Sequence, residues 1–380
     1  MKSVAVLWHS DRTEEPFSTE ILDVSDSLAD DELLIRSECA GICGSDVHVV
    51  RWRSKPGTYV LGHELCGIVE AAGGRFTDAN GQQLRSGDRV VAESIIPCKC
   101  CEFCREADSP RYRNNGYAMC PHSQLIGGQP LGKAPHKIVG AFAERIHIPG
   151  NGLVHRIAPA VAPETAVLTE PLTVAIKAVW NSDISPRERV LVMGPGPIGL
   201  LTVLVLRDWG VEDILLSGTR TDQARLALGR RFGAATVNVD ETPLPDKLRE
   251  LTSGWMPTRV IDATGSGRAM EQALLLVARG GIYTSLGGQP DDIRVAIAPN
   301  HLLRNKIELR FSHTGSKAFP QAIAMLEQGK YPFRELVSHV FSPWDVAKAF
   351  SALINQPETS LKVLLDFRSS AGTPTLPEIF

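Results

Sequence analysis

Two hydrophobic patterns follow one another along the chain. In the first part, apolar residues fall in short alternating or β-branched runs such as "SVAVLWH" and "CGIVEAAG", separated by turn signals such as "DANGQ". Further on, short apolar runs such as "RVLVMG" and "DILLSG" alternate with helical segments such as "TDQARLALGRRFG". The first pattern predicts a barrel-like unit of many short strands, and the second predicts a parallel, doubly wound α/β sheet.

The change of pattern divides the chain into three parts. We expect a β-rich domain over 1–163, a strand–helix domain over 164–310, and a C-terminal segment over 311–380 that returns to mixed structure. The strand–helix domain begins with "ETAVLTEPLTVAIKAVWNS", whose apolar residues have helical spacing. The final stretch, "SSAGTPTLPEIF", is expected to be a loose tail.

Composition and charge narrow the range of partners. Of the 380 residues, 43% are hydrophobic and 22% are charged, and 40 basic minus 43 acidic residues give a net charge of −3. A charge this close to zero gives no electrostatic reason to expect nucleic acid or an anionic membrane as a partner. No apolar run approaches the roughly 20 residues of a transmembrane helix, and the first residues lack the pattern of a signal peptide. We therefore expect a cytoplasmic protein.

Five of the eight cysteines lie in one short segment, "PCKCCEFCREADSPRYRNNGYAMC". Clustered thiols in a reducing compartment bind metal more often than they form disulfides, and four thiolates suit tetrahedral zinc. Three of the thiols have C-x2-C-x2-C spacing, which Cys100 does not fit. The alternatives are a redox-active C-x-x-C pair and a separate zinc-ribbon binding module. The cysteines assigned to the cage are Cys98, Cys101, Cys104 and Cys120.

A glycine-rich turn in "VLVMGPGPIGLL" joins a predicted strand to a predicted helix. In the G-x-G-x-x-G pattern the first glycine allows the tight turn, the second lets a pyrophosphate approach the backbone, and the third lets helix and strand pack closely. The alternative is a plain packing turn. The residues expected to hold the dinucleotide are Gly194, Gly196, Pro197, Ile198 and Gly199.

The next strand end bears on the choice between NAD and NADP. An NAD site usually has an acid about 20 residues further on, which binds the ribose 2′-hydroxyl. Here the strand ends in "SGTR", and Asp222 is more easily read as the beginning of the next helix. Thr219, Arg220 and Arg225 are therefore the candidate contacts to a 2′-phosphate. This favours NADP, with NAD as the alternative, and the alternative role for Arg220 is that of a solvated surface residue.

The segments "CAGICGSDVH" and "LGHE" contain the candidate reaction site. Cys43, His63 and Glu64 offer a thiolate, an imidazole and a carboxylate, which suit zinc with one position left open. Ser45 and His48 can pass a proton from a substrate hydroxyl towards solvent. Taken singly, such a cysteine is usually a buried apolar residue and such a histidine a hydrogen-bonded one. Their occurrence together with the thiol cage and the glycine turn favours a catalytic site.

These motifs occur in the order found in zinc-dependent medium-chain alcohol dehydrogenases, which the chain resembles from about residue 2 to residue 367. It looks most like the polyol and threonine dehydrogenase branch, because "TEP" stands where ethanol-type enzymes carry a cysteine ligand. The resemblance implies a GroES-like catalytic domain, a Rossmann domain, and a homodimer or homotetramer. It implies two zinc ions per chain, a structural one in a lobe at about 97–122 and a catalytic one. The latter's ligands would be Cys43, His63, Glu64 and, directly or through water, Glu170.

The function that we expect is hydride transfer between NAD(P) and a small secondary alcohol or ketone, with polyols as the implied substrate class. One alternative is a biosynthetic reductase of a C=C or imine bond on the same fold. Another is a non-catalytic protein that binds zinc and a nucleotide. Polyol enzymes carry an Arg–Tyr pair before the helix read here as "FPQAIAML", whereas this chain reads "LRFSHTGSKAFP", with Arg310 as the nearest arginine.

Overall fold

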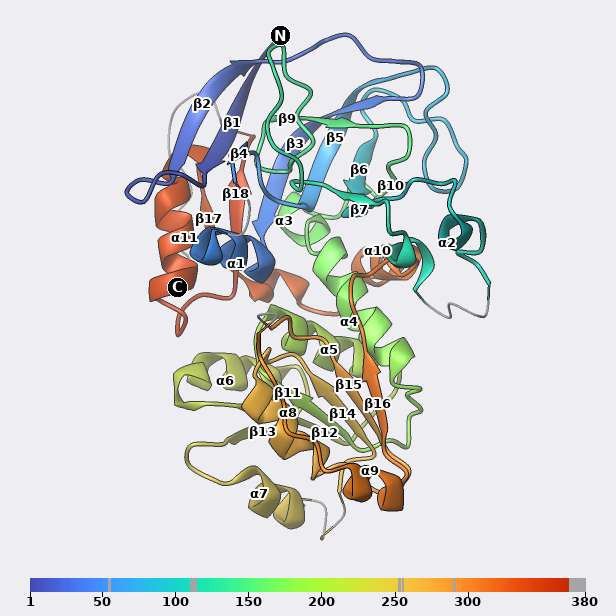
Figure 1. Ribbon diagram of the computed structural model, residues 1–380, viewed down its shortest axis with the longest axis vertical. Helices are drawn as coiled ribbons and strands as arrows, with labels where there is room; N and C mark the ends of the chain where they lie inside the picture. Colours follow the sequence, from blue (N-terminus) through green and yellow to red (C-terminus); the bar gives the residue numbers. More distant parts are fainter. Residues whose placement is uncertain (54–55, 110–114, 252–253, 255, 290–291, 369–380) are drawn as a thin grey trace. The chain divides into compact units, whose positions relative to one another are not determined.

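The structure is a computed structural model, and it divides into two compact units (Figure 1). Unit 1 contains Met1–Glu170 and the residues from Phe319 onward, and unit 2 contains Pro171–Ala318. The tail expected over 369–380 lies outside the described residues. The structure describes residues 1–53, 56–109, 115–251, 254, 256–289 and 292–368.

Unit 1 is built mainly from β-strands. Its larger sheet has the order β10-β6-β5-β3-β18-β17, with β9 also paired to β3, and a second sheet has the order β2-β1-β4. β7 and β8 form a separate pair. The strands are β1 (Lys2–His9), β2 (Phe17–Asp23), β3 (Leu33–Ile42), β4 (Thr58–Tyr59), β5 (Glu64–Ala72), β6 (Arg89–Ala92), β7 (Ile95–Ile96), β8 (Gln124–Leu125), β9 (Arg145–Ile148), β10 (Val154–Arg156), β17 (Val337–Phe341) and β18 (Lys362–Asp366).

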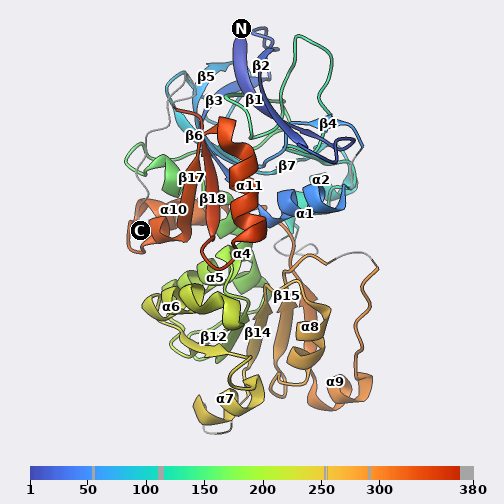
Figure 2. The same ribbon diagram turned by 90° about the vertical axis from the view of Figure 1, so that its left-hand side faces the viewer.

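The C-terminal part of the chain completes this sheet. β18 pairs antiparallel with β3 and parallel with β17, and Figure 2 shows α11 running beside these two strands. Val346, Ala349 and Phe350 of α11 are buried in the core of unit 1. The helices of unit 1 are α1 (Gly44–Trp52), α2 (Glu102–Arg105), α3 (Pro163–Ala166), α10 (Phe319–Glu327) and α11 (Val346–Asn355), with short 3-10 helices η2 (Gly116–Met119), η4 (Phe333–Leu336) and η5 (Pro343–Asp345).

Unit 2 is a six-stranded parallel sheet with the order β13-β12-β11-β14-β15-β16. This is the doubly wound order of dinucleotide-binding folds, in which successive strands are added first on one side of the first strand, β11, and then on its other side. The strands are β11 (Val190–Met193), β12 (Ile214–Gly218), β13 (Ala235–Asn238), β14 (Arg259–Asp262), β15 (Ile282–Ser285) and β16 (Glu308–Phe311). The helices are α4 (Thr169–Asn181), which begins at the junction of the units, α5 (Pro197–Asp208), α6 (Gln223–Arg231), α7 (Leu244–Leu251), α8 (Gly267–Leu274), α9 (Pro299–Asn305) and the 3-10 helix η3 (Arg220–Asp222).

The predicted fold class is confirmed, and the hydrophobic pattern explains it. All four residues of β11 are buried between β12 and β14, which is why this strand is a continuous apolar run. The helical pattern expected after residue 163 is divided between α3 and α4. Pro171 has no N–H to donate, so it fits the first turn of a new helix better than the interior of a longer one. Within the described ranges, none of the helices has the length and apolar character needed to cross a membrane.

Candidate active site

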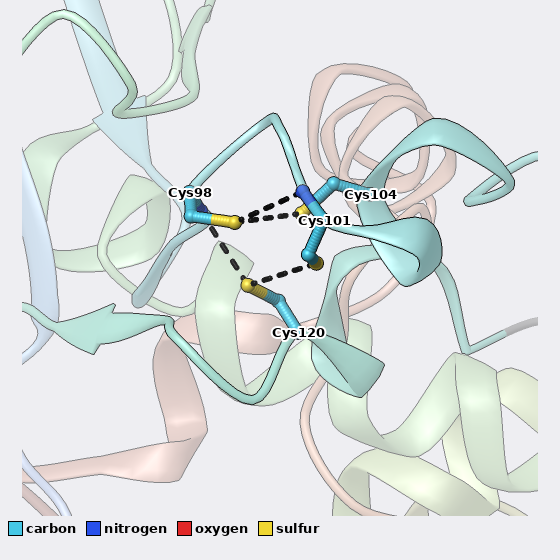
Figure 3. A group of neighbouring side chains, drawn as sticks. All are labelled: Cys98, Cys101, Cys104 and Cys120. Atoms are coloured by element: carbon cyan, nitrogen blue, oxygen red, sulfur yellow. Dashed lines mark hydrogen bonds between the residues drawn. The ribbon is translucent and has the colours of Figure 1, made fainter.

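Four cysteine thiols from separate local elements come together in unit 1 (Figure 3). Cys98 follows β7, Cys101 precedes α2, Cys104 lies within α2, and Cys120 follows η2. The Sγ atoms of Cys98 and Cys104 are 3.8 Å apart, and those of Cys101 and Cys120 are 3.9 Å apart. All four Sγ atoms lie within 4.8 Å of one another. The structure therefore brings together the four thiols that the spacing assigns to a cage.

The geometry of this group fits a single zinc ion. Four sulfurs at about 2.3 Å from a tetrahedral centre are about 3.8 Å apart, close to the two measured separations. Backbone N–H groups of Cys100 and Cys101 point at Cys98 and lower the pKa of its thiol to about 6. This favours the thiolate form that a metal ligand requires. The fifth cysteine of the segment, Cys100, is exposed and stands outside the group.

A second group of donors forms where two segments of unit 1 meet. Cys43 caps the beginning of α1, His63 lies just before β5, and Glu64 is the first residue of that strand. The ligand atoms of these three residues lie within 4.8 Å of one another. One sulfur, one nitrogen and one oxygen make a donor set that suits zinc and leaves a tetrahedral position open. The three predicted ligands are thus neighbours in the fold.

Asp46, which is not among the residues predicted from the sequence, fixes the two segments relative to each other. Its carboxylate accepts a hydrogen bond of 2.9 Å from the N–H of Cys43 and one of 3.3 Å from the N–H of Gly62. It also lies 3.8 Å from Nδ1 of His63. Burial raises the pKa of Asp46, and His63 opposes this shift. The available signal was the three-residue separation of Cys43 and Asp46, which is the spacing of a capping box.

Lys362 is a second site residue that is not among those predicted from the sequence. Its Nζ lies 2.6 and 2.8 Å from the two carboxylate oxygens of Glu64 and 3.3 Å from the carbonyl oxygen of Ile42. Both charged side chains are buried, and a Cβ on Gly41 would lie 2.0 Å from Oε2 of Glu64. Burial lowers the pKa of Lys362, but the negative charges of Glu64, Cys43 and Glu170 together outweigh it, so the net direction is upward. Glu64 is therefore already paired with a cationic side chain, that of Lys362, without a metal ion.

Glu170 stands near this group without being one of its three members. Its Oε1 accepts a hydrogen bond of 3.1 Å from the hydroxyl of Ser94, another residue missed in the sequence. Burial raises the pKa of Glu170, whereas His63 lowers it. Glu170 and His63 each shift the pKa of the other, so the carboxylate of Glu170 interacts electrostatically with the donor group. This position is compatible with a ligand that binds either directly or through water.

The residues of the expected proton relay lie on α1. Ser45 is exposed and His48 is half-buried, and their three-residue separation puts them on one face of the helix. Among the described residues, no hydrogen bond joins Ser45 directly to His48. The ring of His48 stacks on that of Trp52, with centroids 4.4 Å apart. Burial, followed by the charge of Arg51, lowers the pKa of His48, which therefore gives up a proton readily.

The glycine turn in unit 2 has the conformation that the motif requires. Gly194 has a φ of 88° and donates a hydrogen bond to the carbonyl oxygen of Ser217. A Cβ on Gly199 would lie 1.9 Å from the carbonyl oxygen of Gly194, so helix α5 could not begin so close to β11. A Cβ on Gly196 would meet open space at the N-terminus of α5, with Pro197 and Ile198 in the first helical turn. The turn thus leaves room for an anion at a helix N-terminus.

The end of β12 carries the residues considered for the coenzyme ribose. Thr219 precedes η3, and both its N–H and its hydroxyl donate to Asp222, which caps α6. Arg225 donates to the same carboxylate at 3.1 Å. Arg220 is exposed, and its backbone N–H donates to Asp240. Asp222 thus stands where α6 begins, as the sequence pattern suggested, and its carboxylate is engaged by Thr219 and Arg225.

Arg310 is held by groups within unit 2. It lies on β16 and donates to the carboxylates of Asp183 and Glu308 at 2.6 and 2.5 Å. It also donates to the carbonyl oxygen of Asn181 at 2.8 Å. These contacts give Arg310 a structural role in this chain.

A β unit with two groups of metal-ligand residues and a doubly wound unit with a glycine turn together define a metal- and nucleotide-dependent oxidoreductase. Comparisons with known families agree. Residues 29–159 match the model of the alcohol dehydrogenase GroES-like domain, and residues 163–367 match that of the glucose dehydrogenase C-terminus. The chain belongs to the zinc-dependent medium-chain alcohol dehydrogenase family.

Individual relatives give the same result. The chain is 28% identical to D-arabitol-phosphate dehydrogenase from Enterococcus avium, with 89% of this chain and 90% of the relative covered. It is 30% identical to L-idonate 5-dehydrogenase from Vitis vinifera, with 85% of each covered. A solved alcohol dehydrogenase from Thermotoga maritima shares the fold, with a TM-score of 0.86, 24% identity, and coverage of 96% and 99%. The predicted family and its enzyme class, a dehydrogenase acting on hydroxyl groups, are confirmed.

Proposed function

We propose that this chain catalyses reversible hydride transfer between NADP and the carbinol carbon of a secondary alcohol, with polyols as the substrate class. The observation that carries the proposal is the meeting of Cys43, His63 and Glu64, whose ligand atoms lie within 4.8 Å of one another. The mixed donor set fits a catalytic zinc with one position open for substrate. The nicotinamide ring supplies the hydride chemistry, and the protein binds and orients it.

Cys43, His63, Glu64 and Glu170 would hold the catalytic zinc. Zinc, when bound, supplies a Lewis acid that lowers the pKa of a substrate hydroxyl and polarises a ketone. Asp46 orients two of these ligands through its hydrogen bonds to the N–H groups of Cys43 and Gly62. Lys362 keeps Glu64 in place and offsets part of its charge, and Ser94 does the same for Glu170 by donating a hydrogen bond. The cluster of four thiols would hold a second, structural zinc.

Ser45 and His48 would carry the proton that leaves the substrate hydroxyl. Ser45 accepts this proton as it gives up its own, and His48, one helical turn away, passes the charge on to solvent. The lowered pKa of His48 keeps its ring neutral near pH 7, which is the form able to accept a proton. Trp52, which is 50% exposed, holds the imidazole by stacking.

We infer NADP as the preferred coenzyme. Gly196 and the N-terminus of α5 would receive the pyrophosphate. The carboxylate of Asp222 already accepts hydrogen bonds from Thr219 and Arg225. We therefore assign the 2′-phosphate to the exposed Arg220 near the end of β12, with Thr219 beside it. The test is the ratio of kcat/KM for NADP and NAD in wild type and Arg220→Ala. A preference for NADP that persists in Arg220→Ala would contradict this assignment.

The polyol class is inferred from relatives. Three matching proteins carry the names D-arabitol-phosphate dehydrogenase, erythritol/L-threitol dehydrogenase and sorbitol dehydrogenase. Initial rates on linear polyols, polyol phosphates, amino alcohols and cyclic secondary alcohols would test the inference. Highest kcat/KM on a polyol or its phosphate is expected, and a clear preference for a cyclic or amino alcohol would refute it.

Variants of the ligand residues test the reaction site itself. Cys43→Ser and His63→Ala should abolish turnover and bind about one zinc less per chain, while NADPH binding is largely kept. Cys100→Ser, a cysteine outside both donor groups, is the matched control and should remain active. Near-normal turnover of either ligand variant would refute the proposed site.

We also propose that the chain forms a homo-oligomer through the edge of the sheet in unit 2. β16 is the last strand of that sheet, and Phe311 at its end is 67% exposed. An exposed edge strand with an aromatic side chain is suited to pairing with a second copy. Light scattering of wild type and Phe311→Lys tests this, because a wild-type monomer would contradict it.

A further inference from the structure

The fifth cysteine of the thiol segment stands beside the cage. Cys100 is exposed, whereas Cys104 and Cys120 of the cage are buried. Its Sγ lies 3.6 Å from Sγ of Cys98, as close as the cage sulfurs are to one another. The exposed thiol of Cys100 thus lies next to the thiol of Cys98, which would be a metal ligand.

The local backbone accounts for this arrangement. Lys99, between the two cysteines, has a φ of 56°, in the left-handed region that few residues other than glycine adopt. The chain bends at this residue, and the thiols on either side come together. A disulfide requires an S–S distance of about 2.05 Å, so the two sulfurs need to approach by about 1.5 Å, within reach of side-chain rotation.

We propose that Cys100 is a redox modification site that accepts a low-molecular-weight disulfide and transfers the oxidation to Cys98, which dismantles the cage. The inference rests on the proposed structural zinc. Two features carry it: the short Sγ–Sγ distance and the difference in exposure between Cys100 and the buried cage thiols. A cage that loses one of four thiolates no longer offers a closed tetrahedral site.

The chemistry balances in two exchange steps. The sulfur of Cys100 attacks a disulfide RS–SR, forms a Cys100–S–SR bond and releases one RS⁻. The sulfur of Cys98 then attacks Sγ of Cys100, the bond to SR breaks, and a second RS⁻ leaves. Two protein thiols are oxidised and one external disulfide is reduced to two thiols, with the protons exchanged with solvent. A zinc ion held by the cage would be released without a change of oxidation state.

Loss of the metal would destabilise mainly the lobe that contains the cage. The described elements between Cys98 and Cys120 are the four-residue α2 and η2, which are too short to be stable alone. Structural zinc sites contribute folding free energy directly. Oxidation at Cys100 is therefore expected to expose this lobe to proteolysis while the sheets of both units remain folded.

The test uses the full-length, zinc-loaded protein and oxidised glutathione as the disulfide. Zinc release is followed with a chromogenic chelator, and the new bond is located by mass spectrometry after the remaining thiols are alkylated. Wild type is expected to release one zinc per chain and to form a Cys98–Cys100 disulfide. Cys100→Ser should release zinc at least about tenfold more slowly. Cys39→Ala, which removes a buried thiol outside the segment, should behave like wild type.

The outcomes separate this inference from the proposed function. Zinc release from Cys100→Ser at the wild-type rate would overturn the inference, as would a stable glutathione adduct on Cys100 with all zinc retained. A disulfide from Cys100 to any cysteine other than Cys98 would also overturn it. If the four clustered thiols hold no zinc before oxidation, the structural-zinc assignment fails instead, and the mass measurement still decides whether the Cys98–Cys100 bond forms.

Discussion

Lys177 gives a quantitative test of the energetics of unit 2. Its side chain on α4 is fully buried, and its Nζ donates a hydrogen bond of 2.8 Å to the carbonyl oxygen of His313. Burial lowers the pKa of Lys177 from 10.5 to about 8, and among the described residues no carboxylate offsets this effect. The folded protein therefore holds a lysine whose charged form is disfavoured.

The sign of the resulting pH dependence follows from linkage. Below about pH 8 Lys177 is charged in both states, and the full cost of burying its charge is present. Between about pH 8 and 10.5 the folded state has lost the proton and the unfolded state still holds it, so the cost disappears as pH rises. A difference of about 2.5 between the two pKa values corresponds to about 3 kcal/mol. Replacing Lys177 by Met removes this cost and loses one hydrogen bond worth about 1 kcal/mol.

We thus expect Lys177→Met to raise the free energy of unfolding by about 2 kcal/mol near pH 7 and to lower it by about 1 kcal/mol near pH 10.5. Urea unfolding followed by circular dichroism across this pH range measures both values. Lys247→Met, which removes a lysine that pairs with Glu250 at 2.7 Å near the surface, is the control variant. A difference between wild type and Lys177→Met that stays constant with pH would refute the reasoning.

Three further predictions concern the two sites. Gly199→Ala should lower the Tm and weaken NADPH binding, because its Cβ would lie 1.9 Å from the carbonyl oxygen of Gly194. Gly196→Ala should weaken NADPH binding with little loss of Tm, because its Cβ would meet open space. Thermal unfolding measures the Tm, and fluorescence titration measures the binding. Lys362→Met leaves Glu64 buried without its cation and should cost about 3–5 kcal/mol in chemical denaturation, part of which a second change, Glu64→Gln, should restore. Asp46→Asn should lower kcat and the zinc content, measured by elemental analysis, because it weakens the acceptor of two backbone N–H groups.

The fold could be predicted wherever one hydrophobic pattern decided the structure. The buried strand β11 and the apolar helix α5 follow from an uninterrupted apolar run, a glycine turn and a second apolar run. Helix α1 could not be predicted in this way, because "GSDVHVVRW" contains little apolar periodicity and only Asp46 is buried among its residues. What organises this helix is its cap, in which the side chain of Asp46 accepts from the N–H of Cys43.

In the candidate site, the residues that belong to short motifs could be predicted, and the supporting residues from distant parts of the chain could not. Cys43, His63 and the four cage cysteines could be recognised because few residue types can bind zinc, so chemistry restricts the choice at each position. The residues that support them are not restricted in this way. Lys362 is 298 residues from Glu64 and is followed by three apolar residues of β18. The two meet because β18 and β5, which begins with Glu64, pair with opposite edges of β3. A lysine buried at the start of an apolar strand is costly unless it has a partner. Such a lysine therefore indicates that a buried carboxylate lies nearby, and here that carboxylate is a proposed metal ligand.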